Sequence, residues 1–146
     1  PGRFRTRLEP EREAALAELL LDREVQLVCM AGFMRVIHEP LLNAFPGRIM
    51  NIHPSLLPAF PGLHVQQQAL DYGVKIAGCT VHFANGGVDA GPIICQGAVE
   101  VAEDDTAETL AARILEVEHQ LYPRAIQLFI DGRLRVEGRR VRVQPK

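Results

Sequence analysis

The stretch R-I-M-N-I-H-P-S-L-L-P-A-F-P, from Arg48 to Pro61, decides how the rest of the chain is arranged. It begins as an apolar run that carries the polar residues Asn51 and His53, and three prolines then prevent any regular element from continuing. A strand therefore ends where an amide and an imidazole stand two residues apart. In open parallel α/β sheets, ligands bind at the carboxyl ends of strands, so this pair is well placed to act on one ligand. The alternative is that both side chains only satisfy the backbone of the loop.

Length and composition indicate one ordinary globular domain over residues 1–146, because 47% of the residues are apolar and 23% are charged. The formal net charge of −2 gives no reason to expect nucleic acid or a membrane as a partner. Three scattered cysteines without a C-x-x-C pair predict neither a disulfide framework nor a metal site. With no long apolar run and no signal-peptide pattern, we expect a cytoplasmic protein.

Hydrophobic spacing and breaker residues predict alternating helices and strands. Asp105 and Glu108 form a capping-box pattern at the start of the last helix, and Pro123 is expected to kink it. The glycine-rich link at 84–91 is short, so the strands on either side of it should pair antiparallel. We expect helices over 10–22, 41–45, 62–72 and 105–130, strands over 25–30, 49–52, 76–83 and 92–101, and a hairpin of 134–136 with 141–143.

These elements predict an α/β fold: a Rossmann-like, mostly parallel twisted sheet flanked by helices, with an antiparallel edge and a C-terminal hairpin. The sequence has no P-loop, G-x-S-x-G or H-E-x-x-H motif. Asn51 and His53 remain as an amide and an imidazole that can stabilise an oxyanion, with Asp89 as a carboxylate that can support the charged imidazole. Alone, Asp89 would be an ordinary turn residue. Ser55 lies in a proline-rich turn and is a poor candidate nucleophile.

Four motifs resemble those of the phosphoribosylglycinamide formyltransferases, which are folate-dependent enzymes. They are N-I-H-P-S-L-L-P at 51–58, A-G-F-M-R at 31–35, T-V-H-F at 80–83 and V-D-A-G-P-I-I at 88–94. The first motif is shared with methionyl-tRNA formyltransferases. Two further motifs, F-P-G-L-H at 60–64 and E-H-Q-L-Y-P at 118–123, resemble the phosphoribosylglycinamide formyltransferases more narrowly.

This resemblance implies a reaction and a set of site residues. The reaction transfers a formyl group from 10-formyltetrahydrofolate to the amine of glycinamide ribonucleotide in purine synthesis, without a metal, in a monomer or weak homodimer. The implied catalytic residues are Asn51, His53 and Asp89. The implied folate pocket is lined by Met34, Arg35, Val36, Ile37, Ala84, Asn85, Gly86, Gly87 and Val88, and the implied substrate contacts are Asn51, Ile52 and Glu118.

Several alternatives accompany these expectations. The family begins with a strand, a glycine- and serine-rich phosphate loop and a helix, and residues before Arg23 do not resemble them, so we expect the first β-α-β unit to be lacking. A formyltetrahydrofolate hydrolase would use a similar trio, and a folate-binding fragment would not catalyse. For His82 we favour a structural role in a strand, and without the resemblance Glu118 would be a solvated helix residue.

Overall fold

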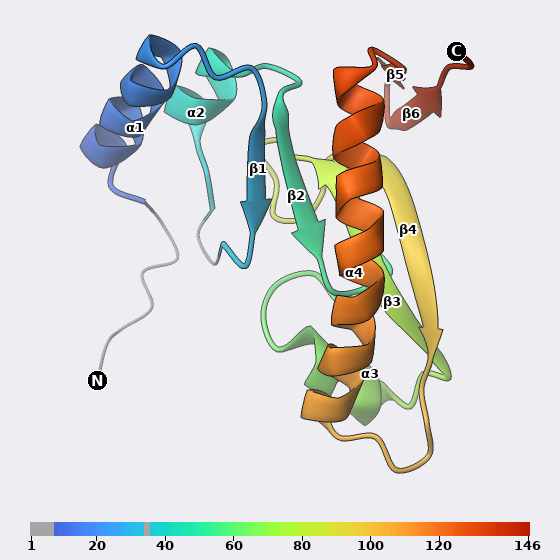
Figure 1. Ribbon diagram of the computed structural model, residues 1–146. Helices are drawn as coiled ribbons and strands as arrows, with labels where there is room; N and C mark the ends of the chain where they lie inside the picture. Colours follow the sequence, from blue (N-terminus) through green and yellow to red (C-terminus); the bar gives the residue numbers. More distant parts are fainter. Residues whose placement is uncertain (1–7, 34–35) are drawn as a thin grey trace.

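The computed structural model describes residues 8–33 and 36–146. In this part of the chain, four helices and six strands build one open sheet with helices packed against it (Figure 1). The expected folate residues Met34 and Arg35 lie outside the described residues. The helices are α1 (Pro10–Asp22), α2 (Glu39–Ala44), α3 (Val65–Tyr72) and α4 (Ala107–Ile130), and the strands are β1 (Val28–Ala31), β2 (Ile49–His53), β3 (Ile76–Phe83), β4 (Ile93–Glu100), β5 (Leu134–Glu137) and β6 (Arg140–Val143).

The described strands lie in the order β1-β2-β3-β4-β6-β5. The pairs β1–β2 and β4–β6 are parallel, whereas β2–β3, β3–β4 and β5–β6 are antiparallel. The predicted fold class, an open α/β sheet with an antiparallel section and a terminal hairpin, is confirmed. More of the pairing is antiparallel than expected, and the β3–β4 pair lies inside the sheet, because the hairpin adds its strand β6 beside β4.

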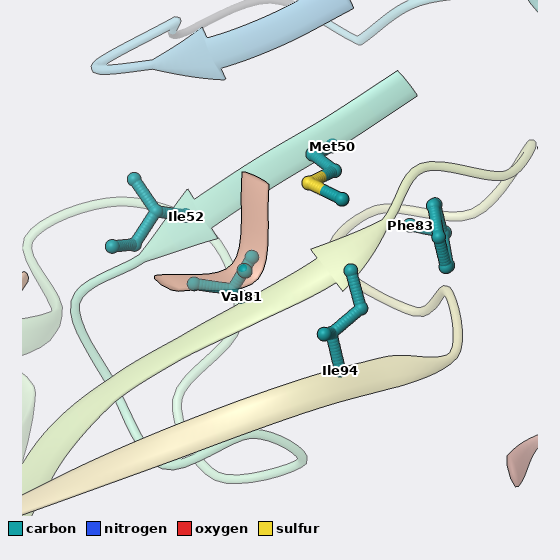
Figure 2. Packing of buried hydrophobic residues seen from close by; sticks show 6 residues of the cluster. Met50, Ile52, Val81, Phe83 and Ile94 are labelled. Carbon is teal, nitrogen blue, oxygen red and sulfur yellow. The ribbon is translucent and has the colours of Figure 1, made fainter. Parts of the chain in front are cut away.

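The main core lies on the side of the sheet that α4 covers. It is formed by every second residue along the strands, because these side chains point to the same face. Met50 and Ile52 of β2 pack with Val81 and Phe83 of β3 and Ile94 of β4, as Figure 2 shows. The fully buried Ala125 of α4 completes this cluster. Burying such apolar side chains contributes roughly 1.5–3 kcal/mol each, so this face supplies much of the folding free energy.

Several element boundaries differ from the predictions by one to three residues, and two of the larger differences have local reasons. Strand β1 begins at Val28 because Val25 still donates its backbone N–H to Leu20 at the end of α1. Helix α3 begins at Val65 because Gly62 and His64 have φ of 93° and 55°, which no right-handed helix contains.

The cap of α4 lies one residue later than predicted. Thr106 and Thr109 form the capping box. Asp105 is not available for that role, because its carboxylate accepts hydrogen bonds from Arg113 and from the backbone N–H of Ala102. The helix then continues through Pro123 to Ile130.

Candidate active site

The polar residues of β2 and β3 share the face of the sheet opposite the main core. Side chains alternate between the two faces of a strand, so Asn51 and His53 point away from Met50 and Ile52. In the antiparallel register, Asn51 lies opposite His82 and His53 lies opposite Thr80. The pairing of two distant segments therefore gathers an amide, two imidazoles and a hydroxyl on one small surface.

His53 is buried, with 6% of its surface exposed, and both ring nitrogens face oxygen atoms. Its Nε2 lies 2.8 Å from the carbonyl oxygen of Phe60. A carbonyl can only accept, so Nε2 carries the donated proton. Nδ1 lies 3.6 Å from Oδ2 of Asp89. That separation is longer than a direct hydrogen bond, so Nδ1 remains available to a ligand atom that enters beside the carboxylate.

Asp89 reaches His53 from the loop that joins β3 to β4. Its backbone has φ of 49°, a left-handed conformation that is uncommon outside glycine and that aspartate tolerates better than most residues. Oδ2 also accepts a hydrogen bond of 2.9 Å from the backbone N–H of Gly62. Two separate loops, one after β2 and one after β3, therefore hold the carboxylate beside the imidazole.

His82 belongs to the same cluster, although the sequence favoured a purely structural role for it. Its Nδ1 lies 3.0 Å from the carbonyl of Phe83 and therefore donates there. Burial is the main cause that lowers the pKa of His82, which favours the neutral ring. The unprotonated Nε2 can then accept from Nδ2 of Asn51 at 3.4 Å, and it lies 3.9 Å from Asp89. His82 thus orients the amide of Asn51.

Ser55 is not an activated nucleophile in this structure. Its side chain is buried, and Oγ donates a hydrogen bond of 2.6 Å to the carbonyl of Ala59. It also lies 3.2 Å from the carbonyl of Phe60. Its proton is donated to a backbone carbonyl, so Ser55 stabilises the loop after β2.

Glu118 lies in the middle of α4. Its carboxyl is half-buried, and burial is the main cause that raises its pKa, while the imidazoles of His119 and His53 oppose the shift. Glu118 is therefore within electrostatic reach of His53. One turn later, the hydroxyl of Tyr122 donates to the carbonyls of Met30 and Met50 at 2.8 and 3.1 Å. This contact ties α4 to both parallel strands.

The other expected site residues fall into two groups. Ile37 and Ile52 are buried in apolar clusters, so each could meet a ligand only through its backbone, and Val36 is half-buried. Ala84 is half-buried, and the loop from Asn85 to Val88 is exposed and leads directly into Asp89. Its turn is closed by a hydrogen bond of 2.8 Å from the N–H of Gly87 to Oδ1 of Asn85.

The described residues contain no group of three or more histidine, cysteine, aspartate or glutamate side chains that could hold a metal ion. None of the described helices is long and apolar enough to cross a membrane.

Comparisons with known proteins show which family the chain resembles. A family model described as formyl transferase matches residues 3–126. The phosphoribosylglycinamide formyltransferase of Bacillus subtilis is 52% identical over 115 residues, which are 79% of this chain and 59% of that protein. The trifunctional purine biosynthetic protein adenosine-3 of Drosophila melanogaster is 50% identical over 120 residues, or 82% of this chain and 9% of that protein.

Solved structures show the same likeness. Glycinamide ribonucleotide transformylase 1 from Symbiobacterium toebii superposes with a TM-score of 0.91 and 59% identity, over 94% of this chain and 68% of that one. A formyltetrahydrofolate deformylase from Pseudomonas syringae superposes with a TM-score of 0.87 at 28% identity, over 94% of this chain and 46% of that one. The chain thus spans only part of the length of its relatives. From the family match and these identities, the chain belongs to the formyl transferase family.

Proposed function

We propose that this chain carries the catalytic cluster of a phosphoribosylglycinamide formyltransferase. The reaction moves the formyl group of 10-formyltetrahydrofolate to the amine of glycinamide ribonucleotide. The observation that supports it most is the cluster of His53, Asp89 and Asn51, brought together from β2 and the loop after β3. The names of the relatives point to the same reaction.

The cluster suits direct attack of an amine on a formyl carbon. As the carbon–nitrogen bond forms, the carbonyl electrons move to oxygen and create an oxyanion. Asn51 has two N–H donors and gives one to His82, so the second is free for that oxyanion. Nδ1 of His53, once it has taken the proton that the amine loses, offers a second donor in the space beside Asp89.

Collapse of the tetrahedral intermediate then breaks the bond between the formyl carbon and N10 of the folate. The amine loses a proton and N10 gains one, so a group must carry a proton between them. The carboxylate of Asp89 and the imidazole of His53 lie 3.6 Å apart and can perform this transfer, directly or through one water. Phe60 keeps Nε2 occupied throughout, which reserves Nδ1 for the reacting atoms.

The folate and the ribonucleotide would bind on different segments beside the cluster. The exposed loop from Ala84 to Val88 ends at Asp89, so a pteridine held there would present its N10 side to the cluster. It would be bound largely through backbone groups, since the loop has few charged side chains. The charge of Glu118 interacts with that of His53, and Glu118 would contact the ribonucleotide.

A hydrolase is the second candidate, because the Pseudomonas syringae deformylase shares the fold over 94% of this chain. The two functions differ in the nucleophile, which is an amine in one and water in the other. The test is to incubate the protein with 10-formyltetrahydrofolate, with and without glycinamide ribonucleotide. We expect formylated ribonucleotide, with little formate when the amine is absent. Formate released at the same rate without the amine would instead establish a hydrolase.

A further inference from the structure

Two side chains of β3 and β4 fasten the proline-rich loop that follows β2. Thr80 is fully buried, and its hydroxyl donates to the carbonyl of Ser55 at 2.7 Å and accepts from the N–H of Leu57 at 3.1 Å. Gln96 donates from Nε2 to the carbonyl of Leu57 at 2.9 Å and to the Thr80 hydroxyl at 3.0 Å. Residues 54–58 form no helix or strand, so these bonds replace a regular ladder.

The far end of the same loop holds the catalytic imidazole. Phe60 presents its carbonyl to Nε2 of His53 at 2.8 Å. The hydroxyl of Ser55 lies within 3.2 Å of that carbonyl and donates to its neighbour Ala59. A continuous path of hydrogen bonds therefore runs from Gln96, through the loop backbone, to the ring of His53.

We propose that Gln96 is a positioning residue for His53. By anchoring the loop to β4, it keeps the Phe60 carbonyl against Nε2, so that the proton of the neutral ring stays on Nε2 and Nδ1 faces Asp89. Gln96 does not touch the reacting atoms. It is exposed and contributes nothing to the core, so its role in the loop can be separated from a role in folding. The consequence for rate depends on the proposed formyl transfer, whereas the consequence for the ring of His53 does not.

The substitution Gln96→Met tests this proposal, because methionine keeps the unbranched length and removes both donors. The matched control is Gln144→Met, an exposed glutamine whose side chain has no hydrogen bond to the described residues. The ring nitrogen shifts of His53, measured by NMR in the full protein, should show the Nε2–H form in the wild type and in the control. In Gln96→Met we expect a mixture of both neutral forms.

Steady-state kinetics provide the second readout. We expect kcat of Gln96→Met to fall about tenfold, with KM for both substrates within about twofold of the wild-type value, because small displacements of a catalytic group cost rate rather than binding. Gln96→Glu, which also lacks the donor, should behave alike and serves if the methionine variant folds poorly. An unchanged Nε2–H signal in folded Gln96 variants would overturn the proposal, and so would an unchanged kcat in an active protein. A wild type without transferase activity would count against the proposed function alone, since the NMR result still decides the role of Gln96.

Discussion

Strands β2 and β3 carry an apolar core on one face and a polar cluster on the other. On one face, Met50 and Val81 are fully buried against α4 and its neighbours. On the other face, His53 and His82 are almost as deeply buried, yet each of their ring nitrogens faces a polar partner. The apolar face is held by area removed from water, and the polar face is held by hydrogen bonds from two loops.

Burial alone therefore does not distinguish a core residue from a site residue. Neighbouring residues of one strand can be equally buried and still differ in what their loss should cost. Substitutions on the apolar face should lower stability with little effect on the chemistry of each folded molecule. Substitutions on the polar face should lower the rate with little effect on stability.

The largest expected effect comes from Met50→Ala on the apolar face. Met50 has no exposed surface, so the substitution should lower the free energy of unfolding by about 3 kcal/mol, within the range for buried methionine. Urea unfolding measures this loss, and the transfer rate per folded molecule should remain near the wild-type value. The exposed Val136→Ala should change stability by less than about 0.5 kcal/mol. A loss below about 1 kcal/mol for Met50→Ala would show that this cluster is not the main core.

Asp89→Asn should produce the opposite result. Asparagine tolerates the left-handed backbone at this position and its amide oxygen can still accept from Gly62, so the fold should be kept. Transfer should fall about 100-fold or more, which corresponds to roughly 2.7 kcal/mol of barrier. Rate and urea unfolding are measured on the same preparation. A variant that retains more than about a third of the wild-type transfer rate would show that Asp89 has no role in the mechanism.

Tyr122→Phe lies between these two extremes, because the tyrosine connects α4 to the strands that carry the site. The substitution removes the hydroxyl hydrogen bonds to the carbonyls of Met30 and Met50, at a cost of about 1–2 kcal/mol in the free energy of unfolding. Denaturant unfolding is again the measurement. Wild-type stability in this variant would mean that the hydroxyl contributes nothing to joining the helix and the sheet.

The smallest expected effect is a pH dependence at Glu118. Because burial raises the pKa of Glu118 above the ordinary 4.5, the folded state binds its proton more tightly than the unfolded state. The sign follows directly: stability falls as the pH rises through the window above 4.5, where the folded carboxyl must ionise in a half-buried place. Glu118→Gln should therefore flatten the fall in melting temperature across that window, and the exposed Glu116→Gln should not. Identical curves for Glu118→Gln and the wild type would contradict this reading.

Much of the fold could be predicted from the sequence, because the residues that end helices and strands act locally. Proline and glycine placed the helix and strand ends within a few residues, and the short link after Phe83 required the antiparallel pair of β3 and β4. The start of α3 was predicted wrongly because it depends on the left-handed backbone at Gly62 and His64. Glycine often adopts this conformation, but a histidine in the sequence does not predict it.

The candidate site was predicted in part. The motif around Asn51 and His53 was visible because both residues lie in one short stretch. The contacts of His82 and Gln96 were not, because they depend on the register between strands that are far apart in the sequence. Once that register is known, His82 lies opposite Asn51 and the role of orienting the amide becomes evident.

The most direct test of the account is the formyl transfer rate of His53→Gln in the full protein. The amide nitrogen of glutamine can take the place of Nε2 and still donate to the carbonyl of Phe60, whereas Nδ1 and the ring charge are lost. We therefore predict a rate at least about 100-fold lower, with the free energy of unfolding within about 1 kcal/mol of the wild-type value. A folded His53→Gln protein that transfers formyl groups at more than about a third of the wild-type rate would contradict the claim that the polar face of β2 and β3 performs the chemistry.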